Sequence, residues 1–149
     1  MGWGDTTRLP RRWFWLVTDD KAAGQDRQYG DPLTAPFWDA AKRNELIVQR
    51  CSTCGHYQFF PRPFCCACSA EHIEWVIASG IGTVVSKTTV RLEVTPEWRP
   101  PYVVAVVQLQ EGPTLLTNIV NGECQIGSRV KVAWRERSDA PPFPVFEPA

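Results

Sequence analysis

Five of the six cysteines in this 149-residue chain lie in one short stretch, from Cys51 to Cys68. They include two Cys-X-X-Cys pairs, Cys51 with Cys54 and Cys65 with Cys68, which are joined by ten residues. Four thiolates on two such turns satisfy a tetrahedral Zn²⁺ ion, so the spacing predicts a metal site. Because protein ligands fill all four positions of such a site, we expect the metal to stabilise the fold rather than to catalyse a reaction.

Two further residues of this stretch bear on the site. Gly55 follows the first pair and supplies the positive φ that such a turn often requires. Cys66 lies inside the second pair and is expected to be a spare thiol, because one residue between it and Cys68 gives poor ligand geometry. The alternatives are iron, which four thiolates also accept, and unliganded buried thiols. Zinc is the metal we expect, because nothing else in the sequence indicates electron transfer.

Positive and negative side chains balance, with 16 Lys and Arg against 16 Asp and Glu. The balance holds separately in residues 1–45, 46–79 and 80–149, so no segment has the basic excess of a typical nucleic-acid-binding protein. The apolar runs are too short to span a bilayer, and Asp5 and Pro10 interrupt the N-terminal stretch where a signal peptide is continuously apolar. We therefore expect a soluble cytoplasmic protein without membrane contact, in which cysteines bind metal rather than form disulfides.

The same three segments differ in their sequence patterns and in the secondary structure that these patterns predict. Residues 1–45 are predicted to be an irregular arm and a short helix, from about Pro36 to Arg43, with Thr34 as N-cap and Asn44 in the left-handed conformation at its end. Residues 46–79, together with the preceding Glu45, contain the strand-like runs "ELIVQR", "YQFF" and "IEWVIAS" around the cysteine pairs. This part is therefore predicted to be a small β unit pinned by metal.

Residues 80–149 contain β-branched runs that begin at Gly82, Tyr102, Thr114 and Ser128, with turn residues between them. Four or five strands without a helical period predict a small barrel, because closure removes exposed sheet edges. The run "VVAVV" is apolar on both faces, which is typical of a central strand. The fold class is therefore mainly β, with an OB-like barrel at the C-terminal end.

Five segments in this order carry a resemblance to a known family: "PFWDAAKRNELIVQRC", "FPRPFC" between the cysteine pairs, "GIGTVVSKTTV", "PPYVVAVVQLQEGP" and "QIGSRVKV". The chain resembles proteins that join a rubredoxin-like zinc ribbon to an acyl-CoA-associated OB fold, and the likeness runs from about Ala35 to Val145. It implies that the zinc ligands are Cys51, Cys54, Cys65 and Cys68. The family often has Gly at Asn44 and Pro at Cys66, and neither departure touches a ligand.

The resemblance implies an accessory small subunit of a heterotetramer or larger complex, partnered with a thiolase-like catalytic subunit that acts on acyl-CoA thioesters. In steroid side-chain degradation the partnered reaction is retro-aldol cleavage of a β-hydroxyacyl-CoA. Elsewhere it is acyl transfer or thiolysis, or hydration beside a hotdog-fold enoyl-CoA hydratase. A nucleic-acid-binding module and a purely structural subunit are the rival classes.

The residues give little support to catalysis by this chain alone. Its only histidines, His56 and His72, lie in or beside the ribbon, and Cys124 has no histidine in its predicted barrel to activate it. The family supplies no catalytic residue for this sequence. We therefore expect the chain to be a required but non-catalytic subunit of an acyl-CoA lyase, such as an aldolase, or of an acyltransferase.

Two groups of residues are candidates for binding. The first group could bind CoA, because it offers cations for the CoA phosphates and an apolar wall for pantetheine. The second group consists of aromatic side chains in an irregular arm, which are typical of a partner interface. The CoA group can also be read as a solvated loop, because Glu93 and Glu97 lie among its members. The CoA candidates are Lys87, Arg91, Trp98 and Arg99, and the interface candidates are Trp13, Phe14 and Trp15.

Overall fold

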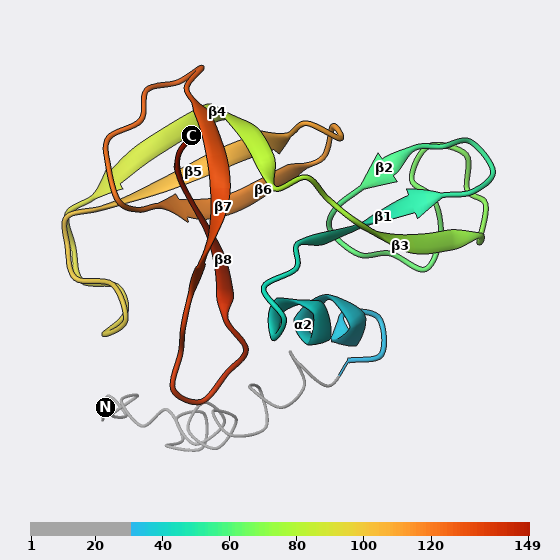
Figure 1. Cartoon of the computed structure of the whole chain (residues 1–149), viewed down its shortest axis with the longest axis horizontal. Helices are drawn as coiled ribbons and strands as arrows, with labels where there is room; N and C mark the ends of the chain where they lie inside the picture. Colours follow the sequence, from blue (N-terminus) through green and yellow to red (C-terminus); the bar gives the residue numbers. More distant parts are fainter. Residues whose placement is uncertain (1–30) are drawn as a thin grey trace, which may run out of the picture.

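The computed structural model describes residues 31–149, and Figure 1 shows a short helix, a small ribbon and a barrel. The helix is α2 (Ala35–Ala41). The ribbon contains β1 (Ile47–Cys51), β2 (Tyr57–Gln58) and β3 (Ile73–Ile77). The barrel contains β4 (Ile81–Val90), β5 (Tyr102–Leu109), β6 (Thr114–Ile119), β7 (Arg129–Arg135) and β8 (Phe143–Pro148). The predicted mainly β class, with a ribbon followed by an OB-like barrel, is confirmed.

Helix α2 packs one face against the rest of the protein and is shorter than the sequence predicted. Phe37 and Trp38 are buried on this face. Asn44 adopts φ 59° just beyond the helix, as predicted. Thr34 is the N-cap residue, as predicted, but its side chain makes no capping hydrogen bond to the helix. Within residues 31–149 no helix is long and apolar enough to cross a membrane.

The ribbon is an antiparallel sheet with the order β2-β1-β3. Its central strand β1 pairs with β2 at Gln49 opposite Gln58, and with β3 along its whole length. The last residue of β1 is Cys51, which lies opposite Ile73. The first sulfur of the cluster is therefore positioned by a strand that has a neighbour on each side.

The barrel closes in the order β4-β5-β6-β8-β7, with β7 paired back to β4. Most neighbours are antiparallel, but β6 and β8 run parallel where Ile119 lies opposite Phe146. The "VVAVV" run lies in β5, between β4 and β6, as expected for a central strand. Strand β8, which contains Pro144, was not among the four strands assigned from the sequence and completes the barrel.

The helix, ribbon and barrel share one hydrophobic core, so their relative positions are held by packing. Trp38 of α2, Val48 of β1 and Phe146 of β8 belong to the same buried cluster. At the junction, the backbone N–H of Ser79 donates to the Glu111 carboxylate at 2.6 Å. In Figure 1 the helix lies below the gap between ribbon and barrel. Side chains from these three parts that line a common surface hollow are therefore held in fixed relative positions.

Gly82 in the "GIGTVVSKTTV" segment has a specific packing role. It pairs with Leu109 of β5, and a Cβ atom there would lie 2.5 Å from Val107 Cγ1 and 2.8 Å from the Gln108 carbonyl oxygen. A backbone atom cannot move aside as a flexible side chain does. The close approach of β4 and β5 therefore requires the absence of a side chain at this position.

We predict that Gly82→Ala destabilises the protein by about 1–3 kcal/mol, because the added methyl group forces β4 away from β5. The measurement is urea unfolding followed by circular dichroism. Thr83→Ala on the adjacent exposed position of β4 is the control and should cost much less. Equal unfolding midpoints for the two variants would contradict the packing role assigned to Gly82.

Candidate functional site

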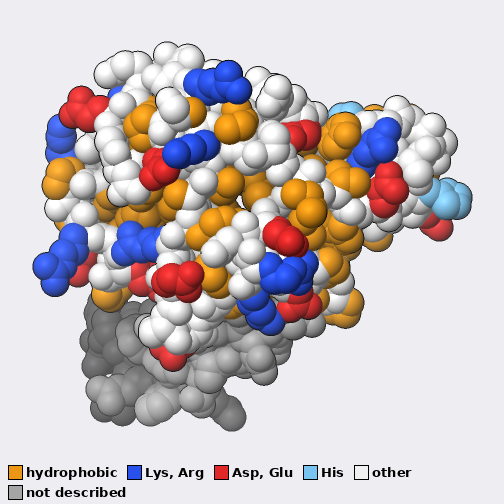
Figure 2. Space-filling model, in the orientation of Figure 1, with side chains coloured by type: hydrophobic (Ala, Val, Ile, Leu, Met, Phe, Trp, Pro, Cys, Tyr) orange, Lys and Arg blue, Asp and Glu red, His pale blue; other side chains and the backbone are white. Residues whose placement is uncertain are grey.

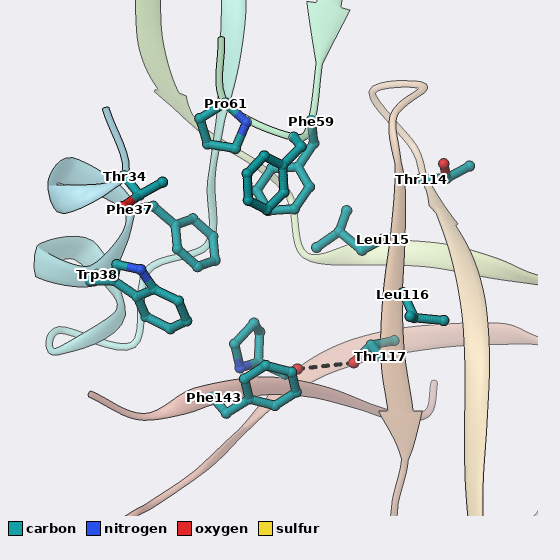
Figure 3. A pocket seen from close by; sticks show the side chains of 12 residues that line it. Thr34, Phe37, Trp38, Phe59, Pro61, Thr114, Leu115, Leu116, Thr117 and Phe143 are labelled. Carbon is teal, nitrogen blue, oxygen red and sulfur yellow. Dashed lines mark hydrogen bonds between the residues drawn. The ribbon is translucent and has the colours of Figure 1, made fainter. Parts of the chain in front are cut away.

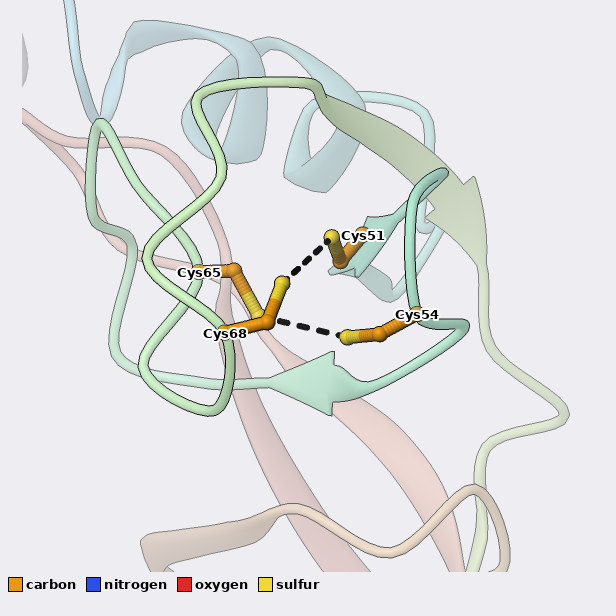
Figure 4. Close-up of side chains that lie close together, drawn as sticks. All are labelled: Cys51, Cys54, Cys65 and Cys68. Carbon is orange, nitrogen blue, oxygen red and sulfur yellow. Dashed lines mark hydrogen bonds between the residues drawn. The ribbon is translucent and has the colours of Figure 1, made fainter.

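Four cysteine side chains from the two turns of the ribbon converge on one point (Figure 4). The Sγ atoms of Cys51 and Cys68 are 3.7 Å apart, and those of Cys54 and Cys65 are 3.6 Å apart. All four sulfurs lie within 4.8 Å of one another. The structure therefore brings together the four residues that the sequence proposed as metal ligands.

This arrangement fits a structural zinc ion. A tetrahedral Zn²⁺ with Zn–S bonds of about 2.3 Å holds its sulfurs about 3.75 Å apart, which is close to both measured separations. Cys51 and Cys65 are buried, and the cysteines are free of disulfide bonds. With four thiolate ligands the zinc keeps no position for water or substrate, so it would stabilise the ribbon and leave chemistry to other groups.

The electrostatics of the cluster favour a bound cation. The backbone N–H of Cys54 lowers the pKa of the Cys51 thiol to about 6. The Ala70 N–H likewise favours the Cys68 thiolate, but the neighbouring sulfurs and burial together raise the pKa of Cys68 to about 12. Four thiolates this close repel one another, so they can all be ionised only around a positive ion.

Both turns of the cluster have the same backbone geometry. Gly55 has φ 75° and its N–H donates to the Cys51 carbonyl at 2.8 Å, which confirms the predicted positive φ. In the second turn Ser69 has φ 60° and its N–H donates to the Cys65 carbonyl at 2.9 Å. Each turn thus closes directly after its second cysteine and directs both of its sulfurs inward.

Two buried glutamines hold the second turn to the strands, and sequence analysis missed them. The Gln58 amide donates to Gln49 Oε1 at 2.9 Å, and Gln58 Oε1 accepts the Cys66 N–H at 2.9 Å. Gln49 Oε1 also accepts the Arg62 N–H at 2.8 Å. These bonds connect the loop between the cysteine pairs to β1 and β2. A glutamine in a strand carries no sequence signal for this role.

The remaining histidines and cysteines lie outside the cluster. Cys66 is exposed, and its Sγ lies 3.3 Å from Nε2 of His56, which is exposed as well. Cys124 is buried, and its carbonyl accepts a hydrogen bond from the Lys87 ammonium at 2.5 Å. His72 is exposed on the ribbon. The group of four sulfurs therefore excludes Cys66, as its spacing predicted.

An apolar groove of about 440 Å³ lies between the helix, the ribbon and the barrel (Figure 3). Phe37 and Trp38 line it from α2, and their rings meet edge to face at 5.0 Å. Phe59 lines it from the ribbon, with its ring centroid 5.3 Å from that of Phe37. In Figure 2 hydrophobic side chains gather between the barrel and the ribbon. The groove thus exists because three separate parts of the fold meet there.

On the barrel side, residues of the neighbouring strands β6 and β8 line the groove. Leu116 is 72% exposed, and Phe60, which lines the groove from the ribbon, is 66% exposed. Thr117 donates its hydroxyl to the Pro144 carbonyl at 2.9 Å, which joins the two strands. Apart from threonine hydroxyls, the described lining side chains offer only hydrocarbon, aromatic or proline surface, without an acid, a base or a thiol. Such a surface can bind an apolar group but cannot transfer a proton.

The structure separates the four candidates for CoA binding. Lys87 is half-buried, and its ammonium is engaged by the Cys124 carbonyl. Arg91 and Arg99 are exposed on the β4–β5 loop. Trp98 lines a hollow together with arginines from the β7 side of the barrel, which sequence analysis did not select. The three interface candidates, Trp13, Phe14 and Trp15, lie outside the described residues.

We predict that Cys51→Ala and Cys65→Ala each abolish zinc binding and leave the ribbon unfolded, because metal binding supplies folding free energy in such small units. Cys66→Ala is the matched control, since it removes a neighbouring cysteine that lies outside the cluster. The measurements are metal content per chain and circular dichroism of purified protein. Soluble, zinc-replete Cys51→Ala protein, or loss of zinc from Cys66→Ala, would contradict this ligand assignment.

Two family models match the chain. The ChsH2 rubredoxin-like zinc ribbon domain matches residues 38–74, and the ChsH2 C-terminal OB-fold domain matches residues 75–135. A DUF35 domain-containing scaffold protein from Pyrococcus furiosus is 35% identical over 113 residues, which are 72% of this chain and 82% of that protein. The likeness to this scaffold protein therefore covers most of both chains.

Two longer relatives contain a similar stretch. A probable enoyl-CoA hydratase alpha subunit from Thermomonospora curvata is 38% identical over 117 residues, which are 76% of this chain. A 3-oxo-4,17-pregnadiene-20-carboxyl-CoA hydratase alpha subunit from Mycobacterium tuberculosis is 31% identical over 115 residues, which are 68% of this chain. The chain spans only 37% of the length of each of these subunits.

A solved structure has the same architecture at comparable identity. The chain described as Ltp2-ChsH2(DUF35) aldolase matches with a TM-score of 0.73 and 35% identity, over 79% of this chain and 95% of that chain. These matches cover the ribbon that contains the sulfur cluster and most of the barrel. The chain belongs to the DUF35 family of the ChsH2 type, in which a rubredoxin-like zinc ribbon precedes an OB-fold domain.

Proposed function

We propose that this chain is the accessory subunit of a heteromeric enzyme that acts on acyl-CoA thioesters, with a thiolase-like chain as its catalytic partner. The observation that carries the proposal is the apolar groove, which has the volume of a ligand site and, among its described lining residues, no group suited to act as a general acid, a general base or an activated nucleophile. A protein with a binding surface and no catalytic groups beside it needs a partner for its chemistry.

The reaction we propose is retro-aldol cleavage of a β-hydroxyacyl-CoA, such as a steroid side chain. The similar structure described as Ltp2-ChsH2(DUF35) aldolase supports this choice. The partner would supply the base and the groups that stabilise the developing enolate. The second candidate is a hydratase complex, which the names of the Thermomonospora curvata and Mycobacterium tuberculosis relatives favour.

The groove would contribute an apolar wall for the acyl thioester. Its volume of about 440 Å³ lies within the range of about 300–1,000 Å³ found for ligand sites, and aromatic rings from two parts of the fold line it. Leu116 is the most exposed large apolar side chain that the barrel contributes to the groove, so a bound acyl group would cover apolar surface that now faces water. The zinc would act indirectly, by holding the ribbon side of the groove.

The first test is affinity purification of the tagged full-length protein from its native host, followed by mass spectrometry of the chains that co-purify. We expect a thiolase-like polypeptide in near-equal amount, and retro-aldol activity in the recovered complex. Recovery of a hotdog-fold hydratase instead would favour the second candidate. Recovery of nucleic acid or ribosomal proteins would refute the acyl-CoA proposal.

A matched pair of leucine variants tests the groove. We predict that Leu116→Gln raises the KM of the complex for a bulky acyl-CoA about tenfold, because a polar side chain replaces apolar contact surface, while kcat changes little. Leu92→Gln is the control, since Leu92 is 77% exposed on the β4–β5 loop and does not line the groove. Equal KM values for the two variants would contradict the proposed role of the groove.

A further inference from the structure

A pocket of about 340 Å³ lies between the ribbon and the turn that joins β5 to β6. His56 and Cys66 line it from the ribbon, and Glu111 lines it from the turn. These three side chains offer an imidazole, a thiol and a carboxylate, which are the groups that bind metal ions in proteins. The described lining residues include no lysine or arginine. The pocket therefore favours a cation over an anion.

His56 and Cys66 place two ligand atoms at a chelating distance. Cys66 Sγ lies 3.3 Å from His56 Nε2, and both residues are exposed to solvent. A tetrahedral Zn²⁺ ion with bonds of about 2.3 Å to sulfur and about 2.0–2.1 Å to nitrogen holds such a pair about 3.5 Å apart. The observed separation is close to this value, so the two side chains can bind one ion with little rearrangement.

The backbone positions of both residues are fixed by hydrogen bonds within the ribbon. The N–H of Cys66 donates to Oε1 of the buried Gln58 at 2.9 Å. The carbonyl of His56 accepts the N–H of Cys51 at 2.9 Å. Ligands that are held in place before an ion arrives lose less conformational freedom when it binds. The two turns of the ribbon thus present a preorganised pair of ligands on their outer side.

Negative charge near the pocket also favours a cation. Glu111 Oε1 accepts the Ser79 N–H at 2.6 Å, whereas its Oε2 is buried and has no hydrogen-bond partner among the residues that the structure describes. A buried carboxylate oxygen without a donor is costly, and a positive ion in the pocket would offset part of that cost. Four thiolates around one Zn²⁺ ion leave the neighbouring cluster with a net negative charge, which attracts a cation as well.

We propose that His56 and Cys66 form a second, outer metal site for a thiophilic divalent cation such as Zn²⁺. Zinc accepts both ligand types, water completes its coordination, and the thiol proton passes to solvent when the ion binds. With only two protein ligands the outer site binds more weakly than the four-cysteine cluster, so it exchanges its ion while the cluster retains zinc. The inference goes beyond the proposed function and does not depend on it.

The competing explanation is that Cys66 and His56 form only a hydrogen bond that joins the two turns. Cys66→Ser separates the two roles, because its hydroxyl can still bond to the imidazole but is a poor ligand for zinc. A metal site predicts that added zinc raises the unfolding midpoint of the unmodified chain and not that of Cys66→Ser. A hydrogen bond alone predicts the same response to zinc in both proteins.

The direct experiment is titration of the full-length chain, with its cluster already loaded with zinc, by Co²⁺. Such sites prefer Zn²⁺ to Co²⁺, so the cluster keeps its zinc, and thiolate-to-cobalt charge-transfer absorption reports a bond to Cys66. We expect this band in the unmodified chain and its loss in Cys66→Ser. His56→Gln should weaken cobalt binding about tenfold, and Glu111→Gln about twofold to threefold. His72→Gln is the matched control, since His72 is exposed and does not line the pocket.

Three outcomes would overturn the inference. They are the absence of the charge-transfer band at millimolar Co²⁺, a band of equal strength in Cys66→Ser, and equal cobalt affinity in His56→Gln and His72→Gln. Zinc content after the titration verifies that cobalt has not entered the cluster. Unfolding midpoints without cobalt show whether a variant that loses the band is still folded.

Discussion

Mutual repulsion among four sulfur atoms, and its relief by a cation, is the constraint on which the ribbon depends. The sulfurs lie within 4.8 Å of one another, and β2 consists of only two residues. Such a small sheet has few apolar contacts of its own, so metal coordination would provide much of its folding free energy. The ribbon in turn carries Phe59 and Phe60 to the groove. A metal site without catalytic capacity can thereby shape a binding surface.

The surface of this chain beside the groove is suited to binding a ligand and not to catalysing a reaction. The described side chains that line the groove offer apolar surface and hydroxyls, and the hollow beside Trp98 offers guanidinium groups. Apart from Glu97 at the hollow, the described residues that line them include no histidine, carboxylate, lysine or cysteine. This division agrees with a subunit that positions a substrate while another chain supplies the reacting groups.

Packing determines how these surfaces face one another. One buried cluster joins α2, the ribbon and the barrel, and the Ser79 N–H bond to Glu111 fastens the connection between ribbon and barrel. Inside the ribbon, Gln49 and Gln58 fix the loop between the cysteine pairs, because they accept hydrogen bonds from its backbone N–H groups. Buried polar groups of this kind are costly unless fully bonded, so they specify one arrangement of the loop.

The sequence by itself determined the features that depend only on residues close together along the chain. The cysteine spacing, the positive φ at Gly55 and Asn44, and the β-branched runs follow from neighbours along the chain. Only tertiary structure decided β8, since its prolines conceal a strand that pairs with β6 and β7. The groove and the hollow were also beyond sequence reasoning, because their walls come from segments separated by up to about a hundred residues. Their contacts depend on barrel closure and ribbon docking, which no local pattern encodes.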